Sequence, residues 1–305
     1  MKIVSVALRI FVGFVFLFSA WIKLYPIELL EVAIVETGLV SWTIAPFAAR
    51  ALVGFEFFLG VMLITGLYKR FFISVSLGTL GIFSVYLLFL FITEGNNSNC
   101  NCFGLAWAMT PMQSIIKNLI LAAVLLLVLF RSKQQTTKSR FRLYATIIAG
   151  VVSVALTFIF SPIIIGVNRF GDDPLNYPLE LSLIYEDPSA AQPTVQLEKG
   201  KQIVVFLSSS CSHCIVAGYK FQVLKSDNPD MPVYFFINGD EEDIRDFHFK
   251  SKSSNIPYSP IKAKALIALA GTHLPAIFWL EDGVVVNKQT YFEISEEEIN
   301  NWLLK

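Results

Sequence analysis

Cys211-Ser212-His213-Cys214 directly follows Ile203-Val204-Val205-Phe206-Leu207, and these two stretches decide the fold of the C-terminal part of the chain. The β-branched and aromatic run predicts a strand that is buried on both faces. The residues from Ile215 to Leu224 predict a helix. A C-x-x-C motif between a buried strand and a helix is typical of a redox-active cysteine pair.

The position of this motif favours a reactive thiolate. A thiolate at a helix N-terminus is stabilised by the helix dipole and by free backbone N–H groups. A protonated His213 would stabilise the Cys211 thiolate further. Cys211 is therefore the predicted nucleophile and Cys214 the resolving thiol. A zinc half-site and a structural disulfide are the alternatives, but no second C-x-x-C or histidine pair completes a metal site.

A second stretch, His273 to Leu280, predicts a turn, a proline and another buried strand, and Asp282-Gly283 then predicts a hairpin. With the C-x-x-C, this pattern resembles the thioredoxin-like family. The resemblance implies that Pro275 is a cis-proline that faces the active-site cysteines and shapes the substrate surface. It covers residues 197–305, including a closing helix from Ser295. The family's buried carboxylate is replaced here by Val205, so proton transfer at the buried cysteine is expected to differ.

The composition divides the chain in two. Hydrophobic residues make up 54% of the 305 residues and charged residues only 16%, with a mean hydropathy of +0.59. Nearly all of the apolar surplus precedes residue 166. The formal net charge is zero, which gives no reason to expect nucleic-acid binding.

Five apolar stretches are long enough to cross a bilayer, which takes roughly 20 residues each. The segment 27–44 is interrupted by glutamates and predicts an amphipathic helix at the membrane surface. The first stretch is too long for a signal peptide, so we expect it to be retained. The predicted spans are 4–22, 48–67, 71–92, 112–130 and 143–165.

The distribution of Lys and Arg predicts the orientation. The loop between the fourth and fifth spans is strongly basic, which places it and the N-terminus in the cytoplasm. Five spans then place the C-terminal domain on the periplasmic side of the inner membrane, where disulfides persist. We expect a membrane bundle over 1–132, a cytoplasmic loop and fifth span over 133–165, an extracytoplasmic linker without regular structure over 166–196, and a thioredoxin-like domain over 197–305.

The other two cysteines, Cys100 and Cys102, lie in a polar loop on the same predicted side of the membrane. Two extended residues span about 6.6–7.2 Å, and a disulfide needs Cα atoms roughly 4.4–6.8 Å apart. A C-x-C disulfide would therefore be strained and prone to exchange. A static loop staple or two idle thiols are the alternatives.

The membrane half is similar to the DoxX/MauE-like membrane proteins, which are small helical bundles. The motif Cys-x-Cys-Phe-Gly at 100–104 carries the resemblance to the MauE branch, together with 18–24 and 56–60. It covers about residues 1–132 and implies a four-helix core, to which this chain adds a fifth span. MauE proteins act in methylamine utilisation beside a separate thioredoxin-like partner, which would here be fused to the membrane part.

Charged residues within the predicted spans suggest further roles. A carboxylate at the middle of a span is costly, so Glu56 is a candidate proton carrier or ion-pair partner. Arg9 is the predicted cation, and its alternative is to snorkel to the cytoplasmic surface. Arg50 and Lys117 are expected to snorkel to the outer surface. A quinone pocket around Phe83, Tyr86 or Trp107 is a further hypothesis. Two histidines, His248 and His273, are expected at the surface.

The sequence therefore predicts a membrane thiol–disulfide oxidoreductase. Electrons would pass between Cys211/Cys214 and Cys100/Cys102, with extracytoplasmic client proteins as substrates and a membrane quinone as terminal carrier. Two alternatives are a Cu(I)-delivering protein that uses paired thiols and a non-redox scaffold whose outer domain binds a partner. Scarce methionine, five in the chain, weakens the copper alternative.

Overall fold

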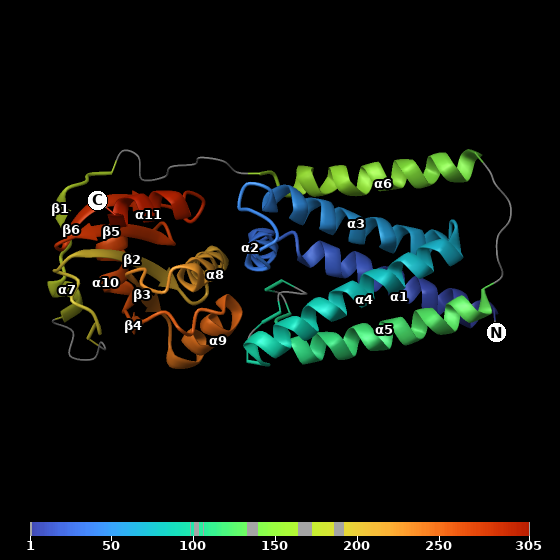
Figure 1. The fold of residues 1–305 in the computed structure, drawn as a ribbon, viewed down its shortest axis with the longest axis horizontal. Coiled ribbons are helices and arrows are strands. Elements are labelled where there is room, and N and C mark those ends of the chain that lie inside the picture. The colour runs from blue at the N-terminus through green and yellow to red at the C-terminus, as the bar shows by residue number, and fades with distance from the viewer. Residues whose placement is uncertain are drawn as a thin grey trace. The chain divides into compact units, whose positions relative to one another are not determined.

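The computed structural model describes residues 2–97, 99–100, 104–105, 107–132, 140–163, 173–185 and 192–304 (Figure 1). The chain divides into two compact units, Met1–Ile163 and Ile164–Lys305. The first is helical and the second contains a β-sheet.

The helical unit confirms the five predicted spans. The described residues include five helices that are long and apolar enough to cross a membrane. A short helix, α2, covers residues 28–36 of the predicted amphipathic segment 27–44, whereas residues 37–44 form turns and bends instead of continuing the helix. Because the C=O and N–H groups of a helix are paired within it, such segments suit the bilayer interior. The helices are α1 (Lys2–Ile22), α2 (Glu28–Glu36), α3 (Ala45–Thr65), α4 (Lys69–Glu94), α5 (Pro111–Arg131) and α6 (Arg140–Phe160).

Small residues allow the helices of this unit to approach closely, as is usual for helices packed in a membrane. A Cβ atom at Gly60 of α3 would lie 2.9 Å from the carbonyl oxygen of Gly13 in α1. On the other side of α3, a Cβ atom at Gly54 would lie 2.8 Å from the Cα of Val154 in α6. Helix α3 is therefore held between α1 and α6 by backbone-to-backbone contact.

Arg50 also joins α3 to the end of α6. Its guanidinium donates to the carbonyl oxygens of Ser161 at 2.7 Å and Pro162 at 3.1 Å, and to Glu31 Oε1 at 2.7 Å. The residue is only 2% exposed. The prediction that Arg50 snorkels is wrong, because the carbonyl groups left unpaired at the C-terminus of α6 give its charge internal partners.

The second unit is built on a six-stranded sheet with the order β1-β6-β5-β2-β3-β4. Strand β2 pairs in parallel with β3 and antiparallel with β5, and β5 pairs antiparallel with β6. A parallel βαβ unit followed by a ββα unit is the predicted thioredoxin-like arrangement. The elements are β1 (Tyr177–Pro178), α7 (Ser182–Tyr185), β2 (Lys201–Ser208), α8 (Ser212–Asp227), β3 (Val233–Asn238), α9 (Glu241–Ser251), β4 (Tyr258–Pro260), α10 (Ala263–Ala270), β5 (Ala276–Glu281), β6 (Val284–Gln289) and α11 (Glu296–Leu304).

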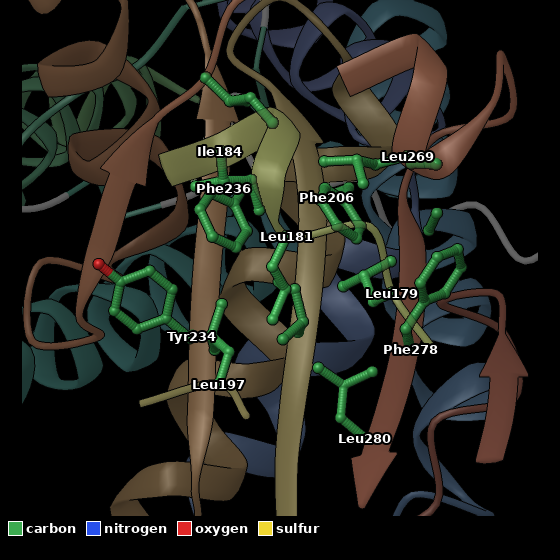
Figure 2. Packing of buried hydrophobic residues seen from close by; sticks show 14 of the residues in the cluster. Leu179, Leu181, Ile184, Leu197, Phe206, Tyr234, Phe236, Leu269, Phe278 and Leu280 are labelled. Carbon is green, nitrogen blue, oxygen red and sulfur yellow. The ribbon is translucent and has the colours of Figure 1, made fainter. Parts of the chain in front are cut away.

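Aromatic side chains from the central strands form the core on one face of this sheet (Figure 2). Phe206 of β2 stacks on Phe236 of β3 at a centroid distance of 5.5 Å and meets Phe278 of β5 edge-on at 5.4 Å. These strands are buried on both faces, as the apolar runs predict, because α8 covers the opposite side with Phe221 against Phe235.

The prediction of an irregular linker over 166–196 is wrong for its middle part, residues 177–185. Strand β1 pairs with β6, and α7 follows it. Leu179, Leu181 and Ile184 are buried in the sheet's core cluster (Figure 2). The segment is ordered because these apolar side chains, spaced between its prolines, bury against the exposed face of the sheet.

Helix α9 has a strongly charged sequence but is not exposed on all sides. One side of it is buried through Ile244, Phe247, His248 and Ser251. His248 is 7% exposed, and its Nδ1 lies 3.0 Å from Ser253 Oγ. The prediction of a surface histidine is wrong for His248 and right for His273, which is exposed. Burial lowers the pKa of His248, which keeps its ring neutral.

The close approach of α3 and α6 gives a stability prediction. Gly54→Ala places a methyl group against the α6 backbone and is expected to cost about 1–3 kcal/mol, the usual cost of overpacking. Gly81→Ala is the matched control, because no atom lies within 4 Å of its Cβ position. Thermal unfolding in one detergent measures both. Equal unfolding temperatures for the two variants would contradict the contact.

Candidate redox site

The two cysteines of the C-x-x-C motif lie where β2 ends and α8 begins. Cys211 is the N-cap of α8, and its Sγ accepts the backbone N–H of Cys214 at 3.2 Å. Cys211 is half-buried, whereas Cys214 is completely buried in the first turn of the helix. Neither is in a disulfide, so the site is in its dithiol form.

The loop before β5 closes the other side of the site. The peptide bond between Leu274 and Pro275 is cis, as the thioredoxin-like resemblance implies. The carbonyl oxygen of Leu274 lies 4.0 Å from Cys211 Sγ. Cys214 Sγ is 3.4 Å from the backbone nitrogen of Ser208, at the end of β2. The structure thus brings together both cysteines and the predicted proline loop.

The two thiols have opposite acidities. The pKa of Cys211 falls from 9.0 to about 7, chiefly because the Cys214 thiol donates a hydrogen bond to it, with help from the backbone N–H groups of Cys214 and His213. Burial raises the pKa of Cys214 well above its ordinary value. The lowered pKa favours the thiolate form of Cys211, and the raised pKa keeps Cys214 protonated.

His213 contributes to the site through its backbone N–H, which helps to lower the pKa of Cys211. The ring is in an exposed residue, stacks on Tyr291 at 5.2 Å, and places Nδ1 2.9 Å from the Tyr291 hydroxyl. Lys220 of α8 in turn donates to the carbonyl of Tyr291 at 2.8 Å.

Tyr291 is a site residue that the sequence did not reveal. It follows β6, 78 residues after His213, and no local pattern marks it. Its hydroxyl reaches the motif only because folding brings the segment after β6 close to the start of α8. The Tyr291 hydroxyl fixes the orientation of the His213 imidazole at the exposed edge of the site.

The lowered pKa predicts the pH dependence of Cys211 alkylation. Iodoacetamide reacts with the thiolate, so the rate at Cys211 should rise with pH and reach half its maximum near pH 7. Cys214→Ala removes the largest favourable hydrogen bond and should move this midpoint up toward 9. Peptide mass mapping at each pH follows Cys211 alone. Identical midpoints in the two proteins would mean that the Cys214 thiol does not tune Cys211.

Cys100, of the membrane pair, is buried in the helical unit. It is 5% exposed and packs against Leu87 and Leu90. Its Sγ lies 3.0 Å from Ser114 Oγ of α5, and its backbone N–H donates to the carbonyl of Met109 at 2.9 Å. Cys102 lies outside the described residues. Burial beside a hydroxyl distinguishes Cys100 from a thiol in an open loop.

The intramembrane carboxylate has a different partner from the predicted one. Glu56 Oε1 is 2.5 Å from Lys23 Nζ, and both residues are buried. Arg9 instead approaches the carbonyl of Ile64 at 3.4 Å. The pairing with Arg9 is therefore wrong. Because Arg9 lies 14 positions before Lys23, about 21 Å along the helix axis at 1.5 Å per residue, only Lys23 reaches the level of Glu56.

Two cavities adjoin this ion pair. The smaller, about 40 Å³, is lined by residues that include Lys23, Glu56, Phe83 and the α5 residues Lys117 and Asn118. The larger, about 230 Å³, shares Lys23 and Phe83 with it and is also lined by Tyr86 and Cys100. Two of the three aromatic residues considered for a quinone pocket, Phe83 and Tyr86, thus line one cavity, whereas Trp107 does not.

Metal ligands do not gather in either unit as far as the structure describes it. Among the described residues, no three His, Cys, Asp or Glu side chains cluster in a way that could hold a metal ion. The chemistry that the described site supports is thiol–disulfide exchange.

A family match that is confined to the first part of the chain agrees with this division. Residues 1–131 match the family model of methylamine utilisation protein MauE. The chain is 26% identical to protein TlpB of Flavobacterium psychrophilum, over 84% of this chain and 82% of that protein. The thioredoxin domain of a thiol–disulfide oxidoreductase from Bacteroides vulgatus is 17% identical, with a TM-score of 0.30 over 35% of this chain and 79% of that one. With the sheet topology and the dithiol, the family match identifies a multi-pass membrane protein in which a MauE-like segment is fused to a thioredoxin-like domain.

Proposed function

We propose that the chain is a membrane-bound thiol–disulfide oxidoreductase that passes electrons between Cys211/Cys214 and Cys100/Cys102. Its substrates are disulfides or thiols of extracytoplasmic client proteins. The observation that carries the proposal is the unequal pair at the start of α8, where Cys211 has a pKa of about 7 and the buried Cys214 a raised pKa. A structural disulfide would not need this asymmetry.

The asymmetry assigns each thiol one step. The Cys211 thiolate attacks a client disulfide, forms a mixed disulfide and releases one client thiol. Cys214 then loses its proton and attacks Cys211, which releases the second client thiol and leaves a Cys211–Cys214 disulfide. Two electrons have moved from the domain to the client. The same steps in reverse oxidise the client.

No carboxylate stands at the family's position in β2 to receive the proton of Cys214. Val205 lies there, completely buried beside the other apolar residues of that strand. In the dithiol form, Cys211 is the neighbouring base, since its thiolate accepts the Cys214 hydrogen bond. Once Cys211 is in a mixed disulfide, the Cys214 proton passes to the client thiolate that the first attack released.

The membrane pair would restore the starting state. Exchange between the Cys211–Cys214 disulfide and the thiols of Cys100 and Cys102 transfers the oxidation to the membrane pair through a second mixed disulfide. The basic cytoplasmic loop and the positive-inside rule support a periplasmic location for both pairs. This location supplies disulfide-containing clients.

The relay is tested by trapping its intermediate. Cys214→Ser removes the resolving thiol, so a mixed disulfide between Cys211 and the membrane pair should accumulate. Non-reducing peptide mapping of the purified full chain would find Cys211 joined to Cys100 or Cys102. Cys214→Ser combined with Cys100→Ser, or with Cys102→Ser, identifies the partner. Cys211→Ser combined with Cys214→Ser is the control that should give no adduct.

Two outcomes contradict the relay. One is a Cys214→Ser protein with Cys211 linked to no membrane cysteine under conditions in which it forms adducts with an added disulfide. The other is that the total amount of disulfide-linked Cys211 stays the same after both membrane cysteines are changed to serine. Either would separate the outer dithiol from the membrane pair.

A further inference from the structure

We propose that the 230 Å³ cavity beside Cys100 binds the ring of a lipid-soluble quinone, which exchanges electrons with the Cys100/Cys102 pair. The inference deepens the proposed function and rests on it, because the relay delivers electrons to Cys100 or takes them from it. It adds the binding site of the terminal carrier and the residues that act on it.

The walls of the cavity suit a flat, apolar molecule. They come from α2, α3 and α4, and the aromatic rings of Phe83 and Tyr86 lie on α4. The volume is close to the lower end of the roughly 300–1,000 Å³ of small-molecule sites. The lining residues are Lys23, Leu30, Ala33, Ile34, Thr37, Leu52, Ile82, Phe83, Tyr86, Leu87 and Cys100.

The position of the cavity in the membrane selects a lipid-soluble occupant. Ile82, in its wall, is 71% exposed on α4, a helix that spans the bilayer. A ligand can therefore reach the cavity from the lipid. The charge of Lys23 is matched by Glu56, so the cavity offers no net positive charge to the phosphates of a nucleotide carrier. A neutral carrier with an apolar tail fits these constraints.

The polar groups in the wall are those that quinone reduction needs. Cys100 supplies a thiol of the pair that is oxidised. Lys23 carries three N–H donors, of which one is used on Glu56 Oε1, and its ammonium lies 5.5 Å from the centroid of the Phe83 ring in the same wall. An N–H of Lys23 can donate to a carbonyl oxygen of the quinone, where negative charge develops on reduction.

The reaction balances without another reactant. The thiols of Cys100 and Cys102 lose two electrons and two protons and form a disulfide, and the quinone gains both and becomes a hydroquinone. Glu56 can hold a proton during this transfer, because its Oε2 is buried and has no hydrogen-bond partner among the described residues. Glu56 lines the smaller cavity, which shares Lys23 and Phe83 with the larger one.

The site is tested by filling it. Ile34→Trp narrows the cavity from α2, and Val85→Trp is the control, since Val85 is 69% exposed on α4 and does not line the cavity. The full chain in nanodiscs is reduced, freed of reductant and mixed with a short-chain ubiquinone or menaquinone. Quinone absorbance gives the single-turnover rate, and solvent extraction of washed nanodiscs gives the bound amount.

The expected result is a loss of about tenfold in bound quinone and in rate for Ile34→Trp, in the range that steric changes in apolar pockets produce, with no change for Val85→Trp. Quinone reduction by Ile34→Trp at the wild-type rate would overturn the site. So would extraction of phospholipid alone from the wild-type chain, which would make the cavity a lipid groove.

The ion pair needs a separate variant. Lys23→Met alone leaves the Glu56 charge buried and is expected to disrupt folding, so Lys23→Met combined with Glu56→Leu is used. Per bound quinone, this variant should reduce the ligand about a hundredfold more slowly, as when one electrostatic donor is removed. An unchanged rate would overturn the role of Lys23.

Mixed-disulfide trapping in the Cys214→Ser background distinguishes the two levels of the proposal. A trapped Cys211–Cys100 or Cys211–Cys102 adduct in a chain that neither binds nor reduces quinone would overturn the quinone site and leave the relay intact. Quinone reduction by the membrane pair without any adduct would overturn the relay instead.

Discussion

The hydrogen bond from the Cys214 thiol to the Cys211 thiolate makes two chemically identical side chains act differently. It depends on the helix start, because only as the N-cap of α8 does Cys211 receive the Cys214 backbone N–H at 3.2 Å as well. It also depends on the central strand β2, which places the motif at the end of a fully buried layer. The sheet therefore serves mainly to hold one sulfur at the surface and one inside.

In the membrane unit, the buried charged groups depend on partners inside the protein. A charge in a low-dielectric interior is stable only when a partner accompanies it. The Arg50 guanidinium donates to the end of α6 and to Glu31, and Lys23 pairs with Oε1 of Glu56. Arg50 thereby links α3 to a helix end that is distant in the sequence, and the Lys23–Glu56 pair lies beside the cavity that Cys100 lines. Structural neutralisation and the proposed redox chemistry thus use neighbouring residues.

Sequence patterns predicted the features that short stretches of consecutive residues determine. The five spans follow from hydropathy, and the strand, C-x-x-C, helix and proline loop follow from runs of a few residues. The partner of Glu56 did not, because it depends on how deep Lys23 reaches after α1 ends. Tyr291 and the burial of Cys100 depend on contacts made after folding. Strand β1 has only two residues, too few for any periodicity, and its order comes from pairing with β6.

That short strand has a consequence for handling the thioredoxin-like domain. β1 covers the edge strand β6, and Asp173 just before it forms an ion pair with Lys288 of β6 at 3.0 Å. A fragment that starts at residue 197 would leave the edge of β6 unpaired. It would also expose to water the apolar surface that Leu179, Leu181 and Ile184 cover. Uncovered edges of this kind recruit strands from other molecules. Residues 173–185 therefore protect the domain against self-association, because they cover this edge and this apolar surface.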